Sequence, residues 1–96
     1  MPQIKWSPSA LNDLERLLSF LKSRNVQAAQ RAVQAIRQAA VSLQEFPQRG
    51  LQVKKGSNQR KLKVSFGKQG YVIYYFIEDD TVVIVRIYHG RENRPR

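Results

Sequence analysis

Two apolar segments close to the C-terminal end constrain the fold most strongly. YVIYYFI (71–77) and VVIVRIY (82–88) are rich in aromatic and β-branched residues, and only EDDT separates them. Such residues favour strands, and a connection this short joins antiparallel neighbours. Because the first segment is apolar at nearly every position, we expect a central strand with a neighbour on each edge.

The segment RKLKVSF (60–66) predicts that further neighbour. It alternates strictly, so that Leu62, Val64 and Phe66 share one side while Lys61 and Lys63 share the other. The short connection FGKQGY joins it to the central strand. The C-terminal half therefore predicts a three-strand antiparallel meander.

The N-terminal half predicts a short strand and two amphipathic helices. QIKW (3–6) alternates, and Ser7 followed by Pro8 is typical of a helix start. The first helix has an apolar stripe of leucines at helical spacing, which Ala10 and Leu17 broaden: Leu11, Leu14, Leu18 and Leu21. The second helix should span 26–45, and its apolar stripe consists of Ala29, Val33, Ile36, Ala40 and Leu43. Pro47 and Gly50 follow as helix-ending residues.

This order predicts a single α+β domain over residues 1–96. We expect an N-terminal strand and an antiparallel helical hairpin packed on one face of an antiparallel β-sheet, which the C-terminal three-strand meander completes. The other sheet face would then be open. Lys61 and Lys63 point to it and, by alternation, Arg86 and Tyr88 should share it.

The charge of the chain indicates a polyanionic partner. Seventeen Lys and Arg against seven Asp and Glu give a net charge of +10 over 96 residues. Nucleic acid and a strongly acidic protein both fit that excess. The chain has no cysteine, and no segment of it predicts a membrane span or a signal peptide. We therefore expect a cytoplasmic protein without a membrane partner.

Composition also limits the chemistry. One histidine and scattered carboxylates predict neither a metal site nor a cofactor. A basic surface bearing Lys61, Lys63, Arg86, Tyr88, His89 and Arg91 could bind phosphates or cleave RNA, with His89 or Tyr88 moving the proton. Equally, His89 could be a half-exposed residue at a strand end, and Tyr88 could pack at the rim of the sheet.

Several motifs together resemble the RelE/ParE superfamily of type II toxin–antitoxin toxins. IKWSPSALNDLERLLSFL is similar to the family's opening strand and long helix, and LQEFPQRG to its helix exit. RKLKVSF and GYVIYYFIEDDTVVIVRIYHGRE are similar to its β-meander. The resemblance implies a growth-inhibiting toxin in a hetero-oligomer with an acidic antitoxin, which would fold across the helices and the sheet.

The resemblance leaves two cellular targets to distinguish. Lys61 and Lys63 match two active-site lysines of the RelE-type nucleases, and Arg91 matches a late arginine. However, Val72 stands where those nucleases have an arginine, and no tyrosine follows Arg91. His89 could compensate, since other nuclease members use a histidine at the end of the last strand.

The resemblance therefore favours a ParE-like inhibitor of DNA gyrase. The residues predicted to contact the target or nucleic acid are Arg60, Arg86, Tyr88 and Arg94. The alternative is a RelE-like endoribonuclease that cuts mRNA on the ribosome, with Lys61, Lys63, His89 and Arg91 as catalytic residues. A further alternative is a non-toxic basic module that binds nucleic acid.

Overall fold

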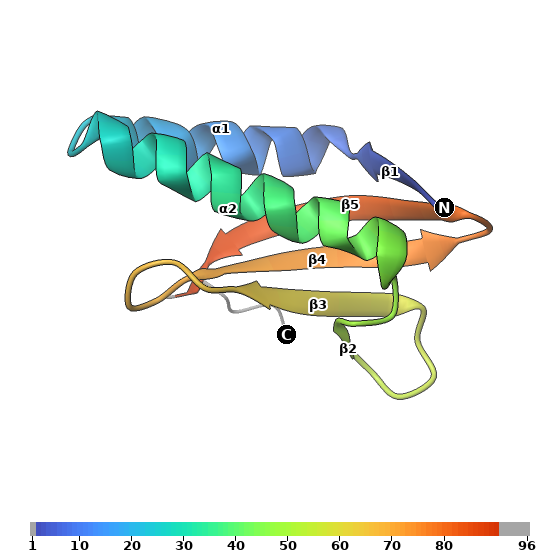
Figure 1. Cartoon of the computed structure of the whole chain (residues 1–96). Coiled ribbons are helices and arrows are strands. Elements are labelled where there is room, and N and C mark those ends of the chain that lie inside the picture. The colour runs from blue at the N-terminus through green and yellow to red at the C-terminus, as the bar shows by residue number, and fades with distance from the viewer. Residues whose placement is uncertain (1, 91–96) are drawn as a thin grey trace.

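Two helices cover one face of a five-stranded sheet in the computed structural model, which describes residues 2–90 (Figure 1). The sheet order is β1-β5-β4-β3-β2. The elements are β1 (Gln3–Trp6), α1 (Pro8–Lys22), α2 (Val26–Glu45), β2 (Leu51–Gln52), β3 (Gln59–Val64), β4 (Tyr71–Glu78) and β5 (Thr81–His89). The predicted α+β fold, with a helical hairpin on a sheet completed by a three-strand meander, is confirmed.

The sheet differs from the expected one in two respects. β1 pairs with β5 in parallel, with Ile4 opposite Val82 and Trp6 opposite Ile84, so the sheet is mixed rather than antiparallel. In addition, the two-residue strand β2 pairs antiparallel with β3 at its outer edge. A strand of two residues carries no periodic signal that could have predicted it.

Both helices begin at side-chain caps. The Ser7 hydroxyl accepts a hydrogen bond from the Ala10 N–H at 3.0 Å, and Pro8 occupies the first turn. The Asn25 side chain accepts from the Ala28 N–H at 3.1 Å, which starts α2. Each such cap contributes about 1 kcal/mol to helix stability. Asn25 thus ends the short connection between α1 and α2, while the apolar residues of each helix determine the face that meets the sheet.

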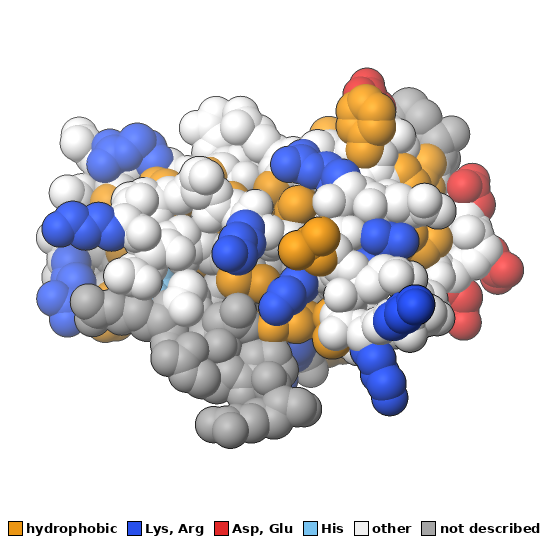
Figure 2. Space-filling view, turned by 90° about the horizontal axis from the view of Figure 1, so that it is seen from below, with side chains coloured by type: hydrophobic (Ala, Val, Ile, Leu, Met, Phe, Trp, Pro, Cys, Tyr) orange, Lys and Arg blue, Asp and Glu red, His pale blue; other side chains and the backbone are white. Residues whose placement is uncertain are grey.

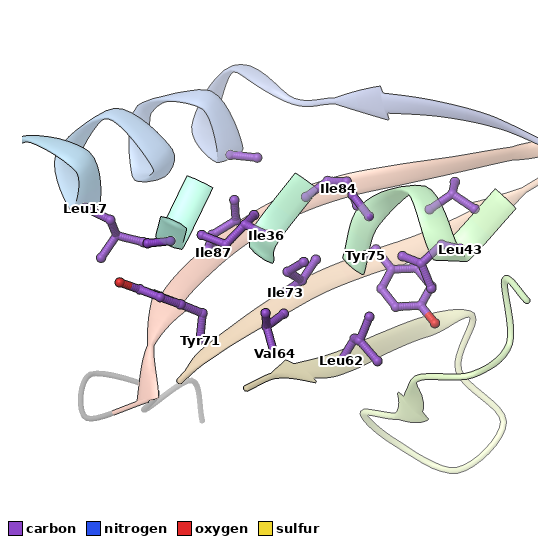
Figure 3. Close-up of a cluster of buried hydrophobic side chains, with 14 residues drawn as sticks. Leu17, Ile36, Leu43, Leu62, Val64, Tyr71, Ile73, Tyr75, Ile84 and Ile87 are labelled. Carbon is purple, nitrogen blue, oxygen red and sulfur yellow. The ribbon is translucent and has the colours of Figure 1, made fainter. Parts of the chain in front are cut away.

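The core lies between the two helices and the covered face of the sheet (Figure 3). Its largest fully buried side chains are Tyr75, Ile36, Leu43, Ile73, Ile84, Ile87 and Val82. On α1 the buried stripe runs through Ala10, Asp13 and Leu17. Leu11, which the leucine spacing placed in that stripe, is 51% exposed. The most buried stripe is therefore centred on Ala10, Asp13 and Leu17, with Leu14 and Leu21 packed beside it, and it includes a carboxylate.

A β-bulge interrupts β5 at Val85. Tyr74 pairs with Arg86, yet its neighbour Tyr75 pairs with Ile84, so Val85 is an extra residue on β5. Ile84 and Ile87 both face the core as a result, although their spacing does not fit simple alternation. The bulge sets which side chains beyond it reach the open face.

Candidate functional site

The face of the sheet that the helices leave uncovered carries side chains in rows that cross the strands. Residues directly opposite each other on paired strands share a face, and neighbouring strands lie about 4.8 Å apart. One row consists of Lys63, Val72 and Tyr88. The next consists of Leu51, Lys61, Tyr74 and Arg86. The prediction that Lys61, Lys63, Arg86 and Tyr88 share the open face is confirmed.

A third row gives the open face a partly apolar character. The Val53 N–H donates to the Gln59 carbonyl at 2.9 Å, which continues the β2–β3 register by one residue. This row consists of Val53, Gln59, Phe76, Val83 and Lys5. At its β2 side the face has two strongly exposed aliphatic side chains, Leu51 at 69% and Val53 at 44%.

Figure 2 shows this face with Lys and Arg side chains spread over it and hydrophobic side chains between them. Asp and Glu side chains lie at the margins of the view. Glu78, at the end of β4, and the turn residues Asp79 and Asp80 account for carboxylates at the β4–β5 turn. Within the three rows of described residues there is no carboxylate. These rows therefore form a positive surface with apolar patches.

Aromatic contacts support the basic rows. The rings of Tyr74 and Tyr88 meet edge to face, with centroids 5.7 Å apart and an interplanar angle of 85°. The Arg86 guanidinium carbon lies 4.9 Å from the centroid of the Tyr88 ring. A cation over an aromatic ring at this separation is attracted to the electron-rich face. Arg86 and Tyr88 are thus held next to each other on the open face.

Asp13 of α1 anchors Arg86 from the edge of the sheet. Arg86 Nε donates to Asp13 Oδ2 at 2.7 Å, and Arg86 Nη2 donates to Asp13 Oδ1 at 3.2 Å. The Ile87 N–H donates to the same carboxylate at 2.9 Å. Burial acts to raise the pKa of Asp13, but the hydrogen bonds from Arg86 and Ile87 and the positive charges of Arg86 and Arg16 outweigh it, so the pKa lies below its ordinary value.

Sequence reasoning gave Asp13 no role. The signal was present, because a carboxylate three residues after Ala10 and four before Leu17 lies in the apolar stripe of the helix. A charged side chain at such a position must find a buried partner. The partner, however, lies 73 residues away in the sequence, so its identity required the fold.

His89 lies on the opposite face of the sheet. It pairs with Tyr71, a core residue, and the two rings meet edge to face with centroids 5.6 Å apart. It lines a pocket under α1 together with Leu17 and Phe20. The expectation that His89 lies beside Lys61 and Lys63 on the open face is therefore wrong. Alternation along β5 explains this, because an outward Tyr88 turns the next side chain inward.

Arg60 donates hydrogen bonds to the loop that follows α2. It pairs with the core residue Tyr75, and its Nη1 donates to the carbonyls of Gln48 at 3.0 Å and Gly50 at 2.6 Å. This places Arg60 on the helix-facing side, away from the basic rows, while its role in target contact stays a prediction. Arg91 and Arg94, also predicted as site residues, lie outside the described residues.

Tyr75 completes the attachment of the same loop. Its hydroxyl donates to the Pro47 carbonyl at 2.8 Å and accepts from the Gly50 N–H at 2.9 Å. A Cβ on Gly50 would lie 2.6 Å from that hydroxyl oxygen and 2.8 Å from the Lys61 carbonyl, so only glycine fits there. Leu51, the first residue of β2, follows directly. The start of β2 is therefore held in place by these hydrogen bonds.

The helix side has an apolar groove of its own. It runs between β1, α1 and α2, and it is lined by Ile4, Trp6, Leu11, Leu14, Arg37, Ala40, Val41 and Gln44. Leu11 and Val41 are 51% and 60% exposed, so the groove is open to a partner. Arg37 supplies a positive charge in its lining.

Metal coordination has no basis in the described part of the chain. Between residues 2 and 90, no three His, Cys, Asp or Glu side chains come together in a way that could hold a metal ion. Among the described helices, none combines the length and the hydropathy that crossing a membrane requires.

Comparisons with known proteins agree with this architecture. A family model described as the ParE toxin of the type II toxin–antitoxin system parDE matches residues 4–94. The toxin RelE3 of Caulobacter vibrioides is 39% identical over 94 residues, which cover 98% of this chain and all of the relative. The toxin RelE1 of the same organism is 38% identical over 88 residues, which cover 92% of each chain.

Two solved structures share the fold. A chain of the chromosomal ParDE toxin–antitoxin system from P. aeruginosa superimposes with a TM-score of 0.76 at 21% identity, covering 93% of this chain and 96% of the other. A chain of the intact E. coli RelBE toxin–antitoxin complex gives a TM-score of 0.61 at 16% identity, covering 92% and 95%. At these identities the likeness concerns the fold alone.

Proposed function

Because this chain belongs to the ParE toxin family, within the RelE/ParE superfamily of type II toxin–antitoxin toxins, we propose that it arrests growth by binding DNA gyrase and that an acidic antitoxin neutralises it. The observation that carries the choice of target is the position of His89, across the sheet from Lys61 and Lys63. The open face then suits binding better than proton transfer.

The chemistry of RNA cleavage explains why this separation matters. Attack by a ribose 2′-hydroxyl requires a group that accepts a proton and groups that stabilise the negative charge that develops on the phosphate. Lys61 and Lys63 could stabilise that negative charge. Histidine is the side chain that exchanges protons most readily near neutral pH, and here it faces the core side. Val72, between Lys63 and Tyr88, adds no charge where the nuclease branch has an arginine.

The antitoxin has a separate candidate position in the groove between β1, α1 and α2. Its apolar lining, with Leu11 and Val41 exposed, fits the apolar stripe of an amphipathic segment. Arg37 in the lining and the net charge of +10 favour a segment rich in Asp and Glu. We therefore assign this groove to the antitoxin and the open face to the target.

A supercoiling assay tests the proposal directly. Purified full-length chain is added to gyrase and relaxed plasmid, and we expect reduced supercoiling or the accumulation of cleaved DNA. Adding the antitoxin encoded beside the toxin gene should restore activity. A folded sample that leaves gyrase unaffected at micromolar concentration would rule out gyrase as the target.

A ribosome-dependent endoribonuclease is the second candidate. It is favoured by the arrangement of Lys63 and Tyr88 in one row of the open face, with Lys61 in the next row. It predicts codon-positioned cuts in mRNA soon after expression begins, and loss of those cuts in Lys61→Ala, Lys63→Ala and Arg91→Ala. If these variants all remain fully toxic, the nuclease hypothesis is wrong.

A further inference from the structure

We propose that the target protein docks on the β2 side of the open face, where Leu51 and Val53 flank Lys61, through an acidic surface that also presents apolar side chains. This inference rests on the proposed function, since it assumes a protein target. It goes further by assigning the residues that make the contact. We call the set of Leu51, Val53, Lys54, Lys55 and Lys61 the β2 patch.

Exposure is the first argument for the β2 patch. Leu51 and Val53 are 69% and 44% exposed. Leu51 begins β2, and Val53 directly follows Gln52, the last residue of β2, with its N–H donating to the Gln59 carbonyl. The row of Leu51 continues through Lys61 to the buried Tyr74, and the row of Val53 continues through Gln59 to Phe76, which is half-buried. Exposed apolar side chains next to aromatic residues, with charges around them, are typical of protein–protein contacts.

The rigidity of the β2 patch is the second argument. Leu51 follows Gly50, which Tyr75 and Arg60 hold by hydrogen bonds of 2.9 and 2.6 Å. Further along, Gln52 Nε2 donates to the Ser57 carbonyl at 3.0 Å, and the Ser57 N–H donates to the Lys54 carbonyl at 2.9 Å. A patch that is already ordered loses little conformational entropy when it binds.

Charge identifies the chemistry of the partner. Lys54 and Lys55 directly follow Val53, and Lys61 lies opposite Leu51. A surface carrying carboxylates complements these cations. A second copy of this chain does not, because two molecules of charge +10 repel each other. Nucleic acid would use the lysines, but aliphatic side chains offer neither a phosphate contact nor a stacking platform.

Matched substitutions test the contact. The double variant Leu51→Ser/Val53→Ser should raise the concentration needed to inhibit gyrase by about 10-fold or more, as expected for loss of central apolar contacts. Val26→Ser is the control for the valine substitution, because it replaces an exposed valine by serine on α2, on the helix side, where the residue is 55% exposed. The concentration of Val26→Ser needed to inhibit gyrase should stay within about 2-fold of the wild-type value. Antitoxin affinity should be unchanged in both variants.

The sign of charge at Val53 provides a second, independent readout. Both Val53→Glu and Val53→Lys remove the apolar contact, but only glutamate opposes an acidic partner. We expect Val53→Glu to inhibit gyrase about 10-fold more weakly than Val53→Lys at low salt, with a smaller difference at high salt. Equal inhibition by these two variants would contradict an acidic partner, even if the serine variants were impaired.

The outcomes separate this inference from the proposed function. If the wild-type chain fails to inhibit gyrase, the proposed target is wrong. If it inhibits gyrase and the double serine variant does so equally well, the target stands and the β2 patch is overturned. If the wild type instead cuts ribosome-bound mRNA and the double variant cuts it as efficiently, a protein contact at the β2 patch is likewise excluded.

Discussion

Arg86 Nε donates to Asp13 Oδ2 across 2.7 Å, which joins α1 to the part of β5 that extends beyond β1. β1 ends at Trp6, opposite Ile84, and the Asp13 carboxylate accepts the Ile87 N–H where a longer β1 would have supplied a carbonyl. The buried Asp13 carboxylate therefore accepts the hydrogen bond of a backbone N–H at the edge of β5, and it also holds Arg86 beside Tyr88.

Asp13→Asn should lower the free energy of unfolding by about 2 kcal/mol, because it removes the negative charge and turns an amide NH2, which cannot accept a hydrogen bond, toward a donor of Arg86. The cost stays below that of a fully buried pair because the Arg86 side chain is 45% exposed. Urea denaturation measures it. Asp79→Asn, in an exposed turn where φ is 55°, is the control and should change stability by less than about 0.5 kcal/mol. If the two variants lose the same unfolding free energy, Asp13 does not stabilise the fold through Arg86 and Ile87.

The same carboxylate predicts a dependence on pH. The pKa of Asp13 lies below its ordinary value of 3.8, so the fold favours the ionised form. Its contribution is therefore complete above the unfolded pKa and disappears as the pH falls through the lower folded pKa. The difference in unfolding free energy between wild type and Asp13→Asn should be constant near neutrality and should shrink below about pH 4. If the stability difference between wild type and Asp13→Asn grows as the pH falls, the pKa of Asp13 is not lowered by folding.

Tyr75→Phe should destabilise the chain by about 1–3 kcal/mol, because it leaves the buried Gly50 N–H without its acceptor. Thermal or urea unfolding measures the change. Tyr88→Phe removes the same hydroxyl from a partly exposed ring and should alter stability by about 0.5 kcal/mol or less. Because Tyr75 also fixes the start of β2, its variant should weaken gyrase inhibition, which a purely local packing effect would not do.

Lys63→Glu should weaken gyrase inhibition by about 10-fold at low salt, because it reverses a charge in the basic rows of the open face. The difference from wild type should narrow as salt is added. Lys22→Glu reverses a charge at the end of α1 and serves as the matched control. Similar losses in the two variants would indicate an effect of net charge instead of a contact on the open face.

Arg37→Glu should weaken antitoxin binding by about 10-fold, since Arg37 lines the groove between β1, α1 and α2. Arg31→Glu makes the same change on α2 at an exposed position outside that lining. Calorimetry with the purified antitoxin would compare them. If Arg37→Glu binds the antitoxin as tightly as the wild type does, the antitoxin binds on a surface other than this groove.

Local patterns in the sequence predicted the elements with good accuracy. The 26–45 helix has the expected bounds because Asn25 caps it and Pro47 follows its end. Lys61 and Lys63 reach the open face because strict alternation along β3 continues without interruption. These features depend on residues within a few positions of each other, which periodicity reports directly.

Features that depend on distant partners could not be predicted in the same way. The parallel pairing of β1 with β5 and the contact between Asp13 and Arg86 join opposite ends of the chain. The bulge at Val85 has no distinctive residue in an apolar run. The position of His89 was predictable in part, because simple alternation from Tyr88 already turns it away from the lysines.

The pairing of the first strand with the last has a consequence during translation. Residues 3–6 are made early, yet their partners at 81–84 are made nearly a whole chain later. The sheet therefore cannot close before residues 81–84 have left the ribosome, and contacts of such long sequence separation also form slowly. A cell that makes this toxin thus has an interval after synthesis begins in which the complete open face does not yet exist and an antitoxin can already be present.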